Sequence, residues 1–355
     1  MKKQFVWVSM ITSTLMFSCM EHEMDKKELN INFDAAYIVN GESNSISVIN
    51  LSTDEVAGTI SLGDESMAGH GGMTDGIMWP HHAYINSTKS ILAIGVPGTD
   101  LSAGHAGGMD NMMGKVALLD AVKGTVSHVI ELEMMNHNAV FSPDGSEIWT
   151  SQMDEMGTVV VYNATTYALK ATIEVGADPA EVTFSADGTV AFVANGGSNT
   201  VTAINPSTKQ VISTIDVGAD PVGAWTGSDN RMYVDNEEGQ TISVVNVGTL
   251  EVEATIDLGF MPGFAAYNDM HNELWVTDPD NGKVHYWITD GGTFTHGGVF
   301  NTRAGAHAIA FTADEMKAYV SNQGDGSVSV VNVSTHTVAK TIAVGKKPNG
   351  IVLKQ

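Results

Sequence analysis

The chain has 355 residues, with 41 acidic and 17 basic side chains, a formal net charge of −24 and one cysteine. So acidic a chain repels phosphate backbones, which argues against nucleic-acid binding. One cysteine allows neither an internal disulfide nor a centre built from several thiolates. The length exceeds that of a typical single core, so the chain holds either two ordinary domains or one repeat architecture.

The N-terminus has the pattern of a secretory leader. Two lysines follow the first methionine, an apolar stretch covers residues 5–17, and Cys19 follows it. The apolar stretch is too short for an ordinary membrane-spanning helix and matches the core of a signal sequence. Cys19 lies where a bacterial lipoprotein signal is cleaved and acylated, although Met16 and Phe17 replace the small residues usual before such a cysteine.

From this pattern we predict three segments. Residues 1–18 form the leader, residues 19–33 an acylated cysteine with a flexible tether, and residues 34–355 the folded domain. The protein is then an exported lipoprotein anchored to a membrane by its lipid, with the outer membrane favoured, facing either the periplasm or the cell surface. A plain signal peptide with an incidental cysteine is the alternative.

Three segments of the chain are most alike, at residues 36–63, 191–218 and 318–345. Each has an apolar stretch ending in Asn, a Gly-rich turn, an alternating stretch, a polar turn and a second alternating stretch. Alternation with a period of two, bounded by Gly, Asn, Asp and Ser, is typical of strands and hairpins. A fourth predicted strand follows a Gly-x-x-Pro turn, as in residues 178–188.

These fourth strands recur along the chain and define the repeat. Their predicted starts are Pro80, Asn136, Pro179, Pro221, Pro262, Ala306 and Pro348, at spacings of 56, 43, 42, 41, 44 and 42 residues. Four strands at such a period indicate an all-β fold, a seven-bladed β-propeller. Residues 35–62 supply three strands without an inner one, so we predict that the C-terminal strand pairs with them and closes the ring.

The repeated motifs resemble a known family. Tyr-Ile-Val-Asn at residues 37–40, Phe-Val-Ala-Asn at 192–195 and Tyr-Val-Ser-Asn at 319–322, with the Val-Gly-x-x-Pro turns that follow, are similar to the YVTN-type β-propeller repeats. The resemblance covers about residues 35–353. It implies the fold and leaves the function open, because such propellers include binding proteins, scaffolds and enzymes.

One position of each inner strand opens on the central channel, on the face where the longest connections lie. The residues at this position are His81, His137, Ala180, Val222, Gly263, His307 and Asn349. The three histidines belong to blades one, two and six. In the closed ring only the blade of Asn349 lies between blade six and blade one. His82 adds a fourth imidazole. We therefore predict that these rings converge, and we assign structural roles to the histidines elsewhere: His128, His271, His285, His296 and His336.

Loops predicted on the same face are rich in His and Met. The candidate ligands in them are His70, Met73, His105, Met109, Met112, Met113, Met134 and Met135. Thioether sulfur suits Cu(I) and is a poor ligand for calcium, magnesium or zinc, whereas imidazole suits both oxidation states of copper. These residues therefore predict a metal site together with His81, His82, His137 and His307, with copper favoured over zinc or nickel. A methionine-rich surface for a protein partner, and hydrogen-bonded structural histidines, are the alternatives.

A second resemblance concerns the channel. Pro80-His81-His82, followed by single histidines in later blades, is similar to the propeller of nitrous oxide reductase, whose histidines hold a copper-sulfide cluster. Ala180, Val222, Gly263 and Asn349 depart from that pattern, and no cupredoxin-like domain is present, so the resemblance implies one or a few ions. Haem, held by a channel histidine in haem d1 propellers, is a less favoured cofactor.

The favoured function is capture, buffering or delivery of copper, with a metal-donor or metal-acceptor protein as partner. A copper-dependent oxidoreductase and a metal-free interaction scaffold are the alternatives.

Overall fold

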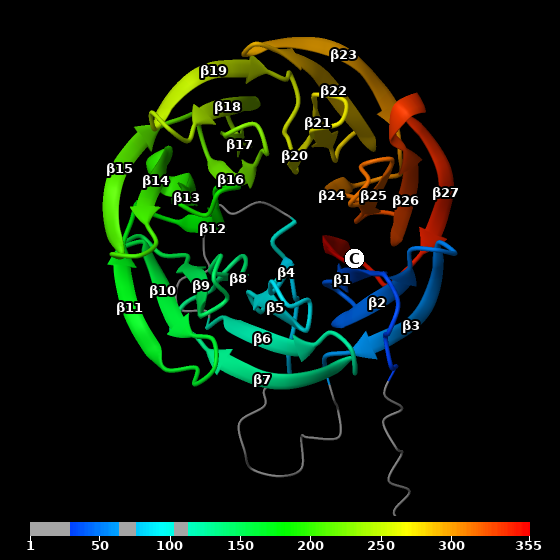
Figure 1. Cartoon of the computed structure of the whole chain (residues 1–355), viewed down its shortest axis with the longest axis horizontal. Coiled ribbons are helices and arrows are strands. Elements are labelled where there is room, and N and C mark those ends of the chain that lie inside the picture. The colour runs from blue at the N-terminus through cyan, green and yellow to red at the C-terminus, as the bar shows by residue number, and fades with distance from the viewer. Residues whose placement is uncertain (1–28, 64–75, 103–112) are drawn as a thin grey trace, which may run out of the picture.

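The computed structural model describes residues 29–63, 76–102 and 113–355. Their strands form seven four-stranded antiparallel sheets, arranged as blades around one axis (Figure 1). Two single-turn 3-10 helices, η2 (Gly196–Ser198) and η3 (Val333–Thr335), are the helical elements of this part of the chain. The predicted seven-bladed β-propeller is confirmed.

The blades are numbered along the chain, and each is given from its inner to its outer strand. Blade 1 contains β4 (Ala83–Ile85), β5 (Ile91–Val96), β6 (Lys115–Asp120) and β7 (Thr125–Glu131). Blade 2 contains β8 (Val140–Phe141), β9 (Glu147–Gln152), β10 (Thr158–Asn163) and β11 (Leu169–Glu174). Blade 3 contains β12 (Pro179–Phe184), β13 (Ala191–Asn195), β14 (Thr200–Asn205) and β15 (Gln210–Asp216).

The remaining blades follow the same order. Blade 4 contains β16 (Pro221–Thr226), β17 (Arg231–Asn236), β18 (Thr241–Asn246) and β19 (Glu251–Asp257). Blade 5 contains β20 (Ala265–Asn268), β21 (Glu273–Asp278), β22 (Lys283–Asp290) and β23 (Thr293–Asn301). Blade 6 contains β24 (Ala306–Phe311), β25 (Lys317–Asn322), β26 (Ser327–Asn332) and β27 (Thr337–Ala343). Blade 7 contains β28 (Pro348–Lys354), β1 (Ala35–Asn40), β2 (Ser45–Asn50) and β3 (Glu55–Ser61).

The two ends of the described chain close the ring. In blade 7 the C-terminal strand β28 is the inner strand and pairs antiparallel with β1, with Ile351 opposite Ile38 and Lys354 opposite Ala35. Figure 1 shows the C-terminus beside β1 at the centre of the molecule. Pairing the two strands removes the edges that an open sheet would expose. The predicted closure is confirmed.

The Asn that ends the second strand of several blades has a structural role. Asn40, Asn195, Asn236 and Asn322 are fully buried. Each Nδ2 donates to two hydroxyls on the next strand, for example to Ser45 (3.2 Å) and Ser47 (3.0 Å) in blade 7. A buried amide is costly unless it finds such partners. The repeated Asn and the Ser or Thr residues that follow it are therefore one hydrogen-bonded unit of the blade.

An aromatic side chain from the second strand fills the space between most neighbouring blades. Tyr37, Trp149, Phe192, Tyr233, Trp275 and Tyr319 occupy the same position of that strand, and each is less than 2 % exposed. Burying a side chain of this size stabilises the fold by about 1.5–3 kcal/mol. Blade 1 has Ala93 at this position and packs with smaller aliphatic residues.

Residues just before the predicted boundary at residue 34 pack against the propeller. Ile31 is 1 % exposed and lies in the core cluster that contains Tyr37 and Leu92. The Leu29 and Ile31 N–H groups donate to the backbone oxygens of Lys123 and Val122 in the turn between β6 and β7. Residues 29–33, assigned from the sequence to the tether, therefore pack on blade 1. Among the described residues, no helix has the length and hydropathy of a membrane span.

Candidate functional site

A β-bulge at the start of the inner strand of blade 1 places two successive side chains in the site. The His81 N–H donates to the oxygen of Gly95 (2.9 Å), and the Gly95 N–H donates to the oxygen of His82 (2.9 Å), so Gly95 faces both residues. The pairings of the inner strands in blades 3, 4, 6 and 7 shift register in the same region. A bulge interrupts the alternation of a regular strand. His81 and His82 are consequently both buried, with ring centroids 4.4 Å apart.

The irregular pairing also corrects three predicted strand starts. The regular parts of β4, β8 and β20 begin at Ala83, Val140 and Ala265, whereas the sequence spacing predicted Pro80, Asn136 and Pro262. In blade 5, Thr277 pairs with both Gly263 and Phe264, as Gly95 does with the histidines. The residues before the regular strand thus keep contact with the blade while their side chains are re-aimed.

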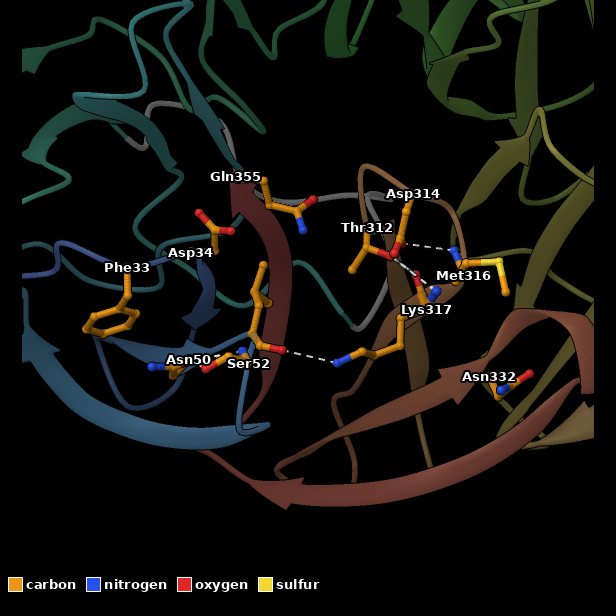
Figure 2. Close-up of a pocket in the computed structure, with 11 residues that line it drawn as sticks. Phe33, Asp34, Asn50, Ser52, Thr312, Asp314, Met316, Lys317, Asn332 and Gln355 are labelled. Atoms are coloured by element: carbon orange, nitrogen blue, oxygen red, sulfur yellow. Dashed lines mark hydrogen bonds between the residues drawn. The ribbon is translucent and has the colours of Figure 1, made fainter.

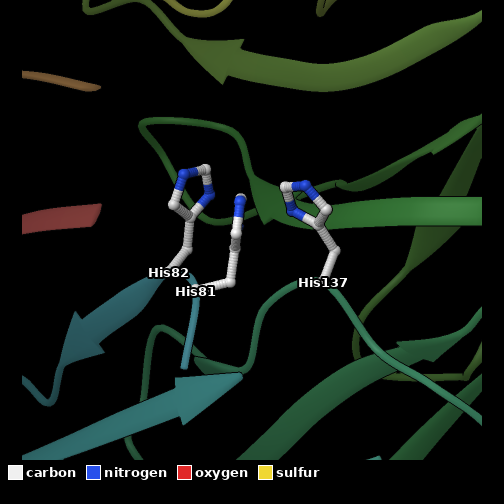
Figure 3. Close-up of side chains that lie close together, drawn as sticks. All are labelled: His81, His82 and His137. Atoms are coloured by element: carbon white, nitrogen blue, oxygen red, sulfur yellow. The ribbon is translucent and has the colours of Figure 1, made fainter. Parts of the chain in front are cut away.

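Four imidazoles from three blades gather at this end of the inner strands. The ring centroid of His81 lies 4.4 Å from that of His82, 4.2 Å from that of His137 and 5.7 Å from that of His307. Figure 3 shows His81 between His82 and His137. Each of these three rings offers a nitrogen, and the three nitrogens lie within 4.8 Å of one another. Nitrogens on one tetrahedral ion at about 2.1 Å lie roughly 3.4 Å apart, so modest side-chain movement brings all three onto one ion.

A fully buried carboxylate orients two of the rings. Glu181 Oε1 lies 2.5 Å from Nδ1 of His82 and 2.6 Å from Nδ1 of His137. The other oxygen accepts from the Tyr84 hydroxyl (3.2 Å) and from the Asn138 side-chain amide. Because both rings meet the same carboxylate oxygen, these contacts fix the orientation of His82 and His137 relative to each other. Carboxylates orient metal-binding histidines in this way.

Sequence reasoning missed Glu181 and Asn138, although the signal was present. Both lie one position after the residue aligned with His81 in their own strands, as His82 does in blade 1. A regular strand would turn that position away from the axis. Because the bulges bring it back, reading two successive positions of each inner strand, instead of one, identifies the whole cluster.

Two glycines let neighbouring backbone approach the histidines. A Cβ on Gly95 would lie 2.5 Å from the backbone oxygen of His137, and a Cβ on Gly350 would lie 2.9 Å from that of His81. The Gly350 N–H donates to the same oxygen of His81 (3.1 Å), which joins the closing strand β28 to blade 1. Any side chain at either glycine would displace the segments that carry the imidazoles.

An aromatic wall flanks His82. The rings of Trp225 and Phe264 contact each other at a tilt of 33°, with centroids 3.8 Å apart, and they lie 5.8 Å and 6.0 Å from the His82 ring. Asp235 fixes the wall from behind, because its Oδ1 accepts from the indole Nε1 of Trp225 (2.8 Å) and from the N–H of Gly223 (2.8 Å). Complete burial, with the nearby charge of Glu237 as a smaller cause, raises the pKa of Asp235 well above its usual range.

We expect the Asp235→Asn variant to gain stability relative to the wild type as pH rises from 5 to 8. The folded wild type retains a proton that the unfolded chain gives up above about pH 4, so its stability falls as pH rises towards the raised pKa. Asparagine keeps the acceptor for Trp225 and does not titrate. Urea unfolding at three pH values should show a relative gain of about 1 kcal/mol or more. An equal difference at every pH contradicts this, and Asp257→Asn, at an exposed position, is the control.

The structure places the methionine candidates in different surroundings. Met135 is 4 % exposed and packs in a cluster with Met153, Ala180 and Val222. Ala180 and Val222 align with His81 in their blades, so this cluster lies at the same end of the inner strands as the imidazoles. Met134 is half-buried, and Met113 is 60 % exposed. The remaining predicted residues lie outside the described part of the chain: Cys19, His70, Met73, His105, Met109 and Met112.

A pocket of about 470 Å³ lies on the opposite face, between blades 6 and 7. Turns on the other side of the ring line it, around Ser52, Asp314 and Asn332 (Figure 2). Its lysine, Lys317, donates to the oxygen of Leu51 (3.1 Å) and to both carboxylate oxygens of Asp54 (2.9 and 3.0 Å). Since this cation is already paired, the pocket is a weaker candidate for chemistry than the imidazole cluster.

Comparisons with known proteins establish the fold and no family. No protein-family model matches the sequence, and neither does any curated protein, so the resemblance to the YVTN-type repeats rests on the motifs alone.

Solved structures with the same fold share little sequence with the chain. A functionally unknown protein from Desulfotomaculum acetoxidans is 15 % identical with a TM-score of 0.71, over 90 % of this chain and 98 % of the other. A periplasmic gluconolactonase from Pseudomonas aeruginosa is 14 % identical with a TM-score of 0.69, over 91 % and 99 %. A putative 6-phosphogluconolactonase from Bacteroides fragilis is 16 % identical with a TM-score of 0.69, over 92 % and 99 %. Likeness at such identity supports a common fold and does not carry function.

Proposed function

We propose that this propeller binds a transition-metal ion, with copper preferred, through His81, His82 and His137, and that His307 lies close enough to join them. One observation carries the proposal: three imidazole nitrogens lie within 4.8 Å of one another, and two of the rings share one buried carboxylate. Imidazoles backed by a carboxylate are the usual ligands of zinc and copper in proteins.

The burial of the cluster favours an ion that is held. His81, His82 and His137 are each at most 3 % exposed, and Glu181 is completely buried. An apolar, water-poor shell around a site strengthens its electrostatic interactions and limits access of solvent. Capture, buffering or delivery of the ion therefore fits this geometry better than rapid exchange with substrate.

Sulfur near the imidazoles supports copper over zinc. Met135 and Met153 lie in contact at the same end of the inner strands, beside the positions that align with the histidines. Thioether ligands favour Cu(I), and an exported protein with one cysteine has few other soft ligands. The His- and Met-rich loops, including His70 and His105, add support from the sequence.

Export and anchoring belong to the same proposal. The basic start, the apolar stretch and Cys19 support a lipoprotein held at a membrane, and a similar solved structure is itself named as periplasmic. A metal-donor or metal-acceptor protein is then the expected partner. The distant resemblance to the nitrous oxide reductase propeller is in accord with copper at the axis.

A second candidate function is an enzyme at the same site. The wall formed by Trp225 and Phe264 stands beside His82, whose ring is hydrogen-bonded to Glu181, so an apolar surface adjoins a carboxylate–imidazole pair that can move a proton. A copper-dependent oxidoreductase would use a bound ion there. Gluconolactone hydrolysis, the activity named for two of the similar structures, would use the pair alone.

Elemental analysis of the anaerobically purified protein tests the proposal. We expect about one copper per chain in the wild type, loss of the metal from the His81→Ala/His137→Ala/His307→Ala variant, and its retention by the control His128→Ala/His271→Ala. Turnover of a redox substrate or a lactone by the wild type would favour the enzyme. If the wild-type protein takes up neither copper nor zinc when each is supplied, the remaining alternative is a metal-free interaction scaffold.

A further inference from the structure

We propose that His285 and His296, in the outer half of blade 5, form a second metal site that binds a borderline divalent ion such as Zn²⁺, Ni²⁺ or Cu²⁺. The Nδ1 of His285 and the Nε2 of His296 lie 3.4 Å apart. Two nitrogens bound at about 2.1 Å to one tetrahedral ion have roughly this separation. The same contact is a long hydrogen bond between the two rings when no ion is bound.

The strand pairing explains why the two rings meet. His296 of β23 is directly opposite Trp287 of β22, and His285 lies two residues before Trp287 on the same face of the blade. His285 and His296 are therefore diagonal neighbours across the strand pair, within reach of long side chains. A register shift between Tyr286 and Trp287 leaves Gly297 unpaired next to His296. The sequence alone hides this proximity, because it depends on the register of the bulged pair.

A carboxylate and two aromatic rings hold the pair in place. Asp278 Oδ2 lies 3.5 Å from Nε2 of His285, which directs that nitrogen towards the carboxylate and Nδ1 towards His296. The Phe260 ring stacks on His285 with centroids 4.4 Å apart, and the Trp287 ring lies 5.3 Å from that of His296. The arrangement repeats the carboxylate–histidine pattern found at Glu181, in a different blade.

The position of the pair leaves room for further ligands. His296 is exposed on the outer strand, so water can fill the remaining coordination positions and the ion can exchange with solvent. Two nitrogens with water suit Zn²⁺, Ni²⁺ or Cu²⁺ and do not suit Ca²⁺ or Mg²⁺, which prefer oxygen ligands.

The second site is independent of the central one. The central imidazoles lie at the starts of inner strands, whereas His285 and His296 lie on the third and outermost strands of blade 5, at the periphery of the ring (Figure 1). Either site can therefore exist without the other.

Zn²⁺ titration of the full chain, with stoichiometry from equilibrium dialysis, tests this inference. We expect the His296→Gln variant to bind one ion fewer than the wild type, or to bind that ion at least about ten-fold more weakly. In a His81→Ala/His137→Ala background the remaining ion should be lost on adding His296→Gln. His128→Gln, on β7 in blade 1, is the matched control and should bind as the wild type does.

The outcomes separate the two sites. Equal stoichiometry and affinity of the wild type and His296→Gln would overturn the second site, whatever happens at the centre. Loss of one ion in His296→Gln together with full retention in His81→Ala/His137→Ala would support the second site and contradict the central one. Because His296 is exposed, its replacement should leave the fold intact, which circular dichroism checks.

Discussion

Replacing Glu181 with glutamine is expected to lower copper affinity by about 10- to 100-fold and to destabilise the fold by about 3 kcal/mol. One carboxylate oxygen contacts the Nδ1 atoms of His82 and His137, and the other accepts hydrogen bonds from Tyr84 and Asn138. An amide has one accepting oxygen, so in either orientation its NH2 group meets donors in a completely buried place. Competitive copper titration and urea unfolding measure the two effects.

Glu147→Gln is the matched control for this substitution. Glu147 is also a buried glutamate, paired with Lys170 and Lys209 at the start of β9, away from the histidines. Its replacement should lower stability and leave copper affinity unchanged. If Glu181→Gln binds copper as tightly as the wild type, the carboxylate has no role in metal binding. An equal loss of affinity in both variants would show that general destabilisation is the cause.

Deletion of residues 348–355 is expected to abolish cooperative folding. The deletion removes β28, so the inner edge of β1, fully buried in the closed ring, becomes exposed. It also removes Ile351 and Leu353 from the cluster that contains Ile38 and Tyr319. The loss is comparable with the whole stability of a typical domain, about 5–15 kcal/mol. Thermal unfolding and size-exclusion chromatography should show an aggregating protein without a cooperative transition.

A peptide of residues 346–355 should restore folding when it is added to the truncated chain, because a free strand can pair with an open sheet edge. The same peptide with Ile351→Asp and Leu353→Asp should fail, since it cannot pack in the blade 6–blade 7 interface. If the truncated chain unfolds at the same temperature as the full chain, closure by β28 does not stabilise the propeller.

The fold could be predicted from the sequence because one physical unit recurs. A buried Asn such as Asn195 needs the hydroxyls of Thr200 and Thr202, so strand, turn and partner strand appear together in each repeat. Blades 1 and 2, which carry His81 and His137, have Val96 and Gln152 where other blades have Asn or Asp. The repeated sequence pattern is therefore least complete in the two blades that carry most of the candidate site.

The candidate site could be predicted only in part. The alignment of inner strands found His81, His137 and His307, because equivalent positions of blades face one axis. It missed Glu181, since a period-two pattern takes one position of each inner strand, whereas the bulge brings two successive positions to the axis. The pairing of His285 with His296 was also missed, and both had been given structural roles. Whether the His- and Met-rich loops join the centre remains a prediction, because His70 and His105 lie outside the described residues.

X-ray absorption at the copper edge of the loaded protein tests the central claim most directly. In a His296→Gln background, which removes the second site, the account predicts three or four nitrogen scatterers at about 2.0 Å with the multiple-scattering pattern of imidazole. These scatterers should be lost when His81→Ala/His137→Ala/His307→Ala is added. A sulfur or oxygen shell without imidazole, or the same spectrum in that variant, would contradict a copper centre at the inner strands.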